Sequence, residues 1–165
     1  MWAFMTTGST PFLKKLTANY SNITFHFMTR ATSTVVYYEH ERNKSIFVSG
    51  RRYEIIEQSG QISEKGFVVI DTIPVSSDHG DIFQERVKKM LPTLRHFPNL
   101  KAIRFLKQHK KTTFVIILQW HSERAYRDWE NSPLYERTNF VQHARLPAYF
   151  AERPHRATYI MLEEE

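Results

Sequence analysis

Short apolar runs alternate with polar segments along the first half of the chain. Residues 2–7 predict a strand. Ser9-Thr10-Pro11 predicts a helix start, because a hydroxyl cap and a proline at the first helical position are both favoured there. The apolar stripe of that helix comprises Phe12, Leu13, Leu16 and Tyr20. The stripe predicts that one side of the helix packs on the neighbouring strands.

Three extended runs follow and predict a meander of strands. They cover residues 23–28, 33–40 and 45–50 and are separated by polar, turn-like stretches. Residues 52–60, RYEIIEQSG, are interpreted as a helical turn that ends at Gly60.

The second half repeats this order with stronger signals. Residues 67–75, FVVIDTIPV, predict a strand that is apolar enough to be covered on both faces. A helix is predicted from Asp78 to Leu91. Its apolar face would hold Ile82, Phe83, Val87, Met90 and Leu91, and its opposite face Arg86, Lys88 and Lys89.

Two further strands, two short helices and a last strand complete the second half. The strands cover residues 100–108 and 112–120. Ser122 predicts a helix that ends near Trp129, and Ser132-Pro133 predicts another that reaches Ala144. Residues 156–162 predict the last strand.

Both halves open with strand, helix, strand, strand. This order predicts a ferredoxin-like α+β fold of the dimeric α+β barrel type, with two similar halves in one chain. We expect residues 1–65 to form the N-terminal half and residues 66–165 the C-terminal half. Since no linker rich in proline, glycine or serine separates them, we expect one monomeric unit with an internal pseudo-dimer.

Composition narrows the possible chemistry. Of the 165 residues, 41% are hydrophobic and 14% aromatic, which is enough for a well-packed core. There is no cysteine, so disulfides, thiolate metal sites and cysteine nucleophiles are excluded. This suits a reducing cytoplasm. No apolar run approaches the roughly 20 residues that cross a bilayer, and the first residues are too short and uncharged for a signal peptide. A cytoplasmic protein is therefore expected.

The net charge of +6 is spread along the chain. Its densest groups are residues 86–89 and Lys107, Lys110 and Lys111. Such charge suits nucleic acid, an acidic membrane face or an anionic small molecule, or is simply a solvated surface. No aromatic-basic signature of RNA-binding strands occurs, and no nucleic-acid partner is expected.

Asp71 is the first candidate for chemistry. Strand alternation places it on one face with Phe67, Val69, Ile73 and Val75. An unpaired buried carboxylate costs several kcal/mol. Asp71 should therefore have an arginine or lysine partner, lie at a cavity, or have a raised pKa.

Tyr135, Asn139 and His143 form the second candidate group. They recur every four residues, so a helix opened by Pro133 would place them on one face. His143 could bind a metal and Asn139 could orient a polar ligand. The alternative is a surface histidine. Trp129 could likewise be a core residue or the wall of a cofactor site.

Several segments together resemble a known family. FVVIDTIPV, FQERVKK, LKAIRFLK and TTFVIILQWHSERAYRDWENSPLYE resemble the antibiotic-biosynthesis-monooxygenase domain, and more closely the IsdG-type heme-degrading enzymes. TTGSTPFLKKL, YYEHE and RRYEIIEQSGQISEKGF resemble HmoB-type monooxygenases and TRAP-like proteins. The likeness covers nearly the whole chain.

The resemblance implies a heme site between the sheet and the C-terminal helices. Heme would be both substrate and cofactor, oxidised by O₂ with electrons from an unknown donor. The family uses a strand asparagine, a tryptophan and, ten residues later, a histidine that ligates iron. Asp71, Trp129 and Asn139 occupy these positions here, so Trp129 alone matches.

The remaining candidates for this site are Tyr135, Arg86 and His143. His143, one helical turn beyond Asn139, is the candidate metal ligand. We expect a cavity between Trp129, the Asn139 helix and strand 67–75, with a basic rim for heme or another anionic aromatic molecule.

Three functions follow from this resemblance. The first is a heme-degrading monooxygenase, and the second is a non-catalytic, TRAP-like regulatory protein. The third is a cofactor-independent oxidation of aromatic compounds.

Overall fold

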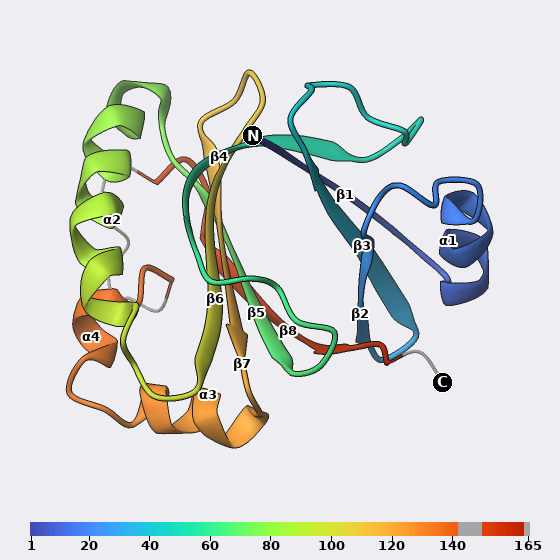
Figure 1. Cartoon of the computed structure of the whole chain (residues 1–165). Helices are drawn as coiled ribbons and strands as arrows, with labels where there is room; N and C mark the ends of the chain where they lie inside the picture. The colour runs from blue at the N-terminus through green and yellow to red at the C-terminus, as the bar shows by residue number, and fades with distance from the viewer. Residues whose placement is uncertain (142–149, 164–165) are drawn as a thin grey trace.

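The computed structural model describes residues 1–141 and 150–163. Within these ranges, eight antiparallel strands close one barrel in the order β1-β3-β2-β8-β5-β7-β6-β4 (Figure 1). The strands are β1 (Trp2–Gly8), β2 (His26–Arg30), β3 (Ser33–His40), β4 (Arg51–Ser59), β5 (Phe67–Pro74), β6 (Leu100–Gln108), β7 (Thr113–Trp120) and β8 (His155–Met161). The helices are α1 (Thr10–Thr17), η1 (Ser77–His79), α2 (Gly80–Leu94), α3 (Glu123–Glu130) and α4 (Tyr135–Thr138).

The barrel consists of two four-stranded units with the same internal order. In the first unit β4 pairs with β1, β1 with β3, and β3 with β2. In the second, β8 pairs with β5, β5 with β7, and β7 with β6. The units join where β2 meets β8 and where β4 meets β6. The predicted ferredoxin-like α+β fold with two similar halves is therefore confirmed.

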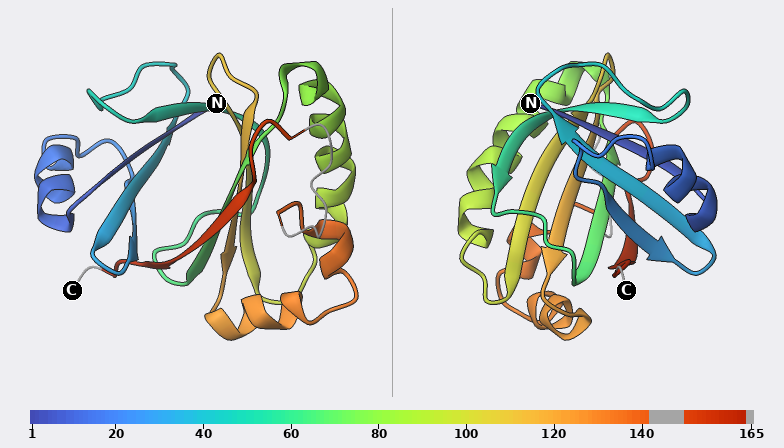
Figure 2. Two further views of the ribbon diagram at one scale, coloured as in Figure 1. Left: turned by 180° about the vertical axis from the view of Figure 1, so that it is seen from behind. Right: turned by 45° about the vertical axis from the view of Figure 1, so that its right-hand side comes forward.

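Three apolar clusters fill this architecture. One contains residues from all eight strands, Tyr37 and Ile70 among them, and fills the barrel interior. The second lies between the second unit and helices α2, α3 and α4, and the third between the first unit and α1. Figure 2 shows the helices outside the barrel, on opposite sides. Since β5 separates the first two clusters, both its faces are buried as predicted.

The helix starts follow the predicted capping. Ser9 Oγ accepts a hydrogen bond from Phe12 N at the start of α1, and Ser122 Oγ accepts one from Ala125 N at the start of α3. These bonds satisfy backbone donors that have no partner within the helix. The predicted apolar faces are less accurate. Phe12 and Ile82 are 59% and 65% exposed, because Leu13 and Phe83 beside them point to the core instead.

Residues 52–60 were predicted as a helical turn, which is wrong. Residues 52–59 lie in β4, which pairs with β1 and β6 and closes the barrel. Pairing on both sides overrides the local preference of an isolated segment. Residues 45–50 were predicted as a strand and form none. Instead Ile46 N donates to the Tyr38 hydroxyl, and the Phe47 ring packs edge-on against the Tyr38 ring.

The helix predicted from Ser132 to Ala144 is also wrong. Helix α4 has four residues, Tyr135–Thr138, and the backbone of Asn139 is already extended, with ψ at 122°. The helix could not continue to His143 on the same face. His143 itself lies outside the described residues. Among the helices that the structure describes, none is both long and apolar enough to cross a membrane.

We expect residues 66–165 alone to associate in pairs. Without the first half, β6 and β8 lose their partners β4 and β2 and expose two unpaired edges. Pairing β6 of one copy with β8 of another would close a symmetric barrel. Light scattering after gel filtration should give the mass of a dimer for this fragment and of a monomer for the whole chain. A folded monomeric fragment would contradict this expectation.

Candidate functional site

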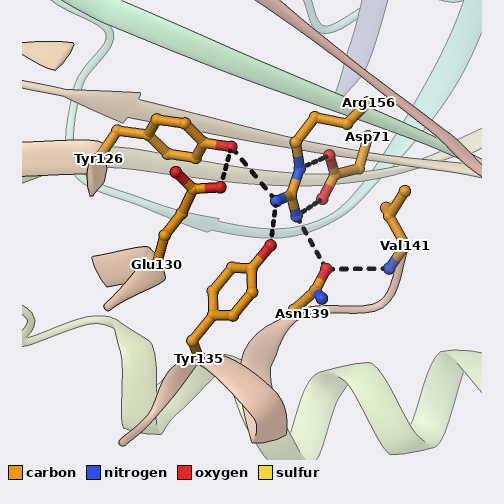
Figure 3. Close-up of polar contacts among 7 residues, drawn as sticks. All are labelled: Asp71, Tyr126, Glu130, Tyr135, Asn139, Val141 and Arg156. Atoms are coloured by element: carbon orange, nitrogen blue, oxygen red, sulfur yellow. Dashed lines mark hydrogen bonds and ion pairs between the residues drawn. The ribbon is translucent and has the colours of Figure 1, made fainter. Parts of the chain in front are cut away.

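A buried ion pair lies between the barrel and its C-terminal helices. Arg156 Nε donates to Asp71 Oδ1 over 2.7 Å, and Arg156 Nη2 donates to Asp71 Oδ2 over 2.9 Å (Figure 3). The two side chains are 6% and 4% exposed. This two-pronged geometry is the strongest arrangement for a guanidinium and a carboxylate.

The strand register brings the pair together. Asp71 on β5 is the direct partner of Arg156 on β8. Directly opposite residues in an antiparallel pair point to the same face, here the face covered by the helices. Their neighbours Thr72 and His155 are also paired and point to the other face. Of the three alternatives for Asp71, an arginine or lysine partner is found, and it is Arg156.

Three aromatic side chains surround the guanidinium. Tyr135 and Tyr126 accept hydrogen bonds from Arg156 Nη1 through their hydroxyl oxygens, over 2.7 Å and 3.4 Å. The Trp129 ring centroid lies 5.3 Å from Arg156 Cζ, a cation–π distance. Helix α3 supplies Tyr126 and Trp129, and α4 supplies Tyr135.

Asn139 lies on the remaining side of the Arg156 guanidinium. Its Oδ1 accepts from Arg156 Nη2 over 3.0 Å and from Val141 N over 3.1 Å. Because the chain turns from helix to extended backbone at Asn139, one amide oxygen holds both the arginine and the segment that follows α4. The amide is therefore fixed in orientation by two donors.

The electrostatics of this cluster favour one ionic pair and two neutral phenols. Burial raises the pKa of the Asp71 carboxyl, and the Arg156 guanidinium opposes this by stabilising the carboxylate. Burial lowers the pKa of Arg156, but hydrogen bonds and charge from Asp71 outweigh it and the net shift is upward. Arginine keeps its proton in proteins, and both Asp71 oxygens accept hydrogen bonds from it, which is the geometry of an ion pair.

The two phenols stay protonated. Burial raises the pKa of Tyr126 to about 12, although Arg156 acts against this shift. Burial also raises the pKa of Tyr135, again opposed by Arg156. Neither hydroxyl can therefore act as a base near neutral pH.

Trp129 is a core residue. It is fully buried and stacks on Trp120, with ring centroids 5.5 Å apart and an interplanar angle of 27°. Its Nε1 donates to Thr138 Oγ1 over 2.9 Å, which ties α3 to α4. A planar ligand could reach the face of this ring that Arg156 covers only by displacing the guanidinium.

The structure brings together four of the predicted site residues: Asp71, Trp129, Tyr135 and Asn139. Arg86 is an exposed residue of α2 and is not among the partners of Arg156 or Asp71 in the described part of the chain. Among the described residues, the Arg156 guanidinium lies between Trp129, Asn139 and Asp71 of β5, where a cavity was expected.

Arg156 and Tyr126 were not predicted from the sequence as site residues. One signal pointed to Arg156, because a buried Asp71 needed a cation and residues 156–162 were a predicted strand. The strand register that pairs Asp71 with Arg156 could not be obtained from the sequence, because the two residues are 85 positions apart.

The described residues do not fit a heme at this position. Heme iron is held by imidazole, thiolate, thioether or phenolate ligands. The two phenols here stay protonated, and the other polar side chains of the described site are a carboxylate, a guanidinium and an amide. The Asn139 oxygen already accepts two hydrogen bonds, and both Asp71 oxygens accept from Arg156. No cluster of three or more histidine, aspartate or glutamate residues able to hold a metal occurs in the ranges 1–141 and 150–163.

Comparisons with known proteins agree with the fold. Residues 66–139 match the family model described as antibiotic biosynthesis monooxygenase, which confirms the resemblance drawn from the sequence motifs. The solved structure of a major regulator of staphylococcal pathogenesis has a TM-score of 0.85 over the full length of both chains, at 21% identity. That likeness shows the shared architecture of the whole chain.

Two relatives have different named roles. The heme-degrading monooxygenase of Listeria monocytogenes is 29% identical over 79% of this chain and 78% of that protein. The signal transduction protein TRAP of Staphylococcus epidermidis is 26% identical over 96% of this chain and 93% of that protein. Sequence similarity alone does not separate an enzyme from a signalling protein here.

Arg156→Ala should lower the free energy of unfolding by about 3–5 kcal/mol, because it leaves the Asp71 carboxylate buried without its partner. Urea denaturation would measure the loss. Replacing both partners, as Asp71→Leu with Arg156→Met, should recover much of it, since no buried charge then remains.

Arg127→Ala provides the matched control. Arg127 also contacts a carboxylate, Glu130, over 2.6 Å, but its side chain is 55% exposed. Exposed pairs contribute about 0–1 kcal/mol. Equal losses for the two arginine variants would show that the Asp71–Arg156 pair is not a buried structural bond.

Proposed function

We propose that this protein has a non-catalytic, regulatory role and does not degrade heme at the position where the IsdG-type enzymes do. One observation carries the proposal: the Arg156 guanidinium fills the space between Asp71, Trp129 and Asn139. The relatives named signal transduction protein TRAP are similar over nearly the whole chain and support this role.

The position of the iron ligand supports the proposal. Asn139 stands ten residues after Trp129, where the family has a histidine. A carboxamide has no basic ring nitrogen, and imidazole is the ligand that suits iron. Asn139 also serves a different purpose, because its oxygen accepts from Arg156 and from Val141 N.

The position of the strand asparagine gives a second argument. Asp71 replaces it and carries a negative charge that Arg156 neutralises. A heme would have to separate this pair and leave a carboxylate facing the oxygen-binding side. Removing one partner of a buried pair costs about 3–5 kcal/mol, which heme binding would first have to supply.

Heme degradation is the second candidate function. The 29% identity to the Listeria monocytogenes enzyme favours it, as does the retained Trp129. In this case heme would bind only after Arg156 leaves the aromatic wall of Tyr126, Trp129 and Tyr135. The chain would then bind heme weakly, because the closed arrangement competes with the ligand.

A hemin titration followed at the Soret band, with reductant then added in air, separates the two candidates. We expect the wild-type protein to show weak or no binding and no bleaching beyond that of free hemin. Tight binding and fast bleaching by the wild type would overturn the non-catalytic proposal.

A triple variant tests whether the Arg156 cluster is what prevents heme binding. Asn139→His supplies an imidazole, Asp71→Asn removes the charge, and Arg156→Leu opens the space without leaving an unpaired cation. Hemin should bind at least about tenfold more tightly than to the wild type, a gain of roughly 1.4 kcal/mol. The matched control carries Asp71→Asn and Arg156→Leu but keeps Asn139. Equal affinity of control and triple variant would show that position 139 does not supply the ligand.

A further inference from the structure

A basic pocket of about 690 Å³ opens at one end of the barrel. Strands β5 and β6 end there, and β4, β7 and β8 begin there (Figures 1 and 2). Its cationic side chains come from separate parts of the chain that the fold brings together: Arg51, Lys107, Lys110, Lys111 and Arg153. His155 also lines it. We call this site the barrel-end pocket.

The charge of the barrel-end pocket is poorly neutralised. Glu152 is the acidic residue in its lining, against five lysines and arginines. None of these five has a nitrogen within 4.0 Å of a carboxylate oxygen belonging to residues 1–141 or 150–163. Five like charges around one hollow repel each other, and an anion bound there would remove that repulsion.

The pocket continues into the barrel. A second hollow of about 290 Å³ shares Arg51, Thr72 and His155 with it. Thr6 and Thr7 of β1 also line this second hollow, together with apolar residues such as Ile70 and Val115. A ligand would therefore meet cations at the entrance and mainly neutral residues further in.

The backbone holds the lysines of the entrance in place. Val75 N donates to Thr112 O over 3.0 Å, and Thr112 Oγ1 donates to Val75 O over 2.6 Å. Lys111 N donates to Gln108 O over 3.1 Å and closes the β6–β7 turn. These bonds fix the backbone at Lys111 and Thr112 beside the end of β5, so the turn that carries Lys110 and Lys111 is held at the entrance.

We propose that the barrel-end pocket binds a small molecule that carries two or more phosphate or carboxylate groups. The volume suits a small ligand, since such sites typically measure about 300–1,000 Å³. Several cations converge on one hollow, and lysine and arginine bind such groups through charge-assisted hydrogen bonds. A concave site of this size differs from the extended basic surface that a nucleic acid requires.

This site is separate from the Asp71–Arg156 cluster. Thr72 and His155 are the sequence neighbours of Asp71 and Arg156, but alternation points them to the opposite face of the same two strands. Binding at the barrel end needs no opening of the buried ion pair. The inference is therefore independent of the proposed function.

Isothermal titration calorimetry with pyrophosphate and with citrate tests the proposal. These two probes distinguish phosphate from carboxylate recognition, and inorganic phosphate reports the effect of a single group. We expect saturable 1:1 binding of at least one of the two probes, more tightly than inorganic phosphate. If neither probe binds the wild-type protein, the proposal is overturned.

Two charge-reversed variants locate the site. The double variant Lys110→Glu with Lys111→Glu should lower the affinity for the probe by at least about tenfold, because it reverses two charges at the entrance. The control, Lys88→Glu with Lys89→Glu, makes the same change in net charge on α2, outside the pocket. Circular dichroism verifies that both variants are folded. Equal weakening in both would show general attraction to a basic protein and overturn the proposal.

Discussion

The bond between Asp71 and Arg156 is the constraint around which the second half of this protein is arranged. The pair joins two neighbouring strands and is buried beneath two helices. A buried charge must have its partners in place, and here the tyrosines of α3 and α4 and the amide of Asn139 complete the shell. The C-terminal helices are therefore positioned by polar contacts as well as by the apolar contacts of Trp129.

The same bond places a guanidinium between Asp71, Trp129 and Asn139. A guanidinium is planar and lies against aromatic rings as a flat ligand would. Arg156 occupies that place from within the chain. A pocket left empty would lose packing energy, and Arg156 avoids that loss while satisfying Asp71.

Much of the fold could be predicted from sequence, because strong local signals agreed with the tertiary structure. Ser9 and Ser122 capped helices as expected, and the runs at 33–40 and 100–108 became strands with the predicted bounds. The prediction of a helical turn at residues 52–60 failed, because the partners that make β4 a strand are distant in sequence. Asp71 could be identified as needing a cation, but the identity of that cation depended on strand register. Tyr135 and Asn139 were chosen as neighbours on a long helix. They do meet at one site, although α4 ends between them.

The two halves of the barrel share a strand order, and each has a helix between its first two strands. They differ in the segment that joins their last two strands. Helices α3 and α4 cover the second half between β7 and β8, whereas residues 41–50 of the first half form no helix between β3 and β4. An assembly of two identical chains carries every substitution twice, so that any loss of stability is doubled by its symmetry. A single chain with two unequal halves experiences each substitution once. One half can therefore change at a position such as Asn139, which here holds Arg156 and Val141, while the other half keeps the barrel closed.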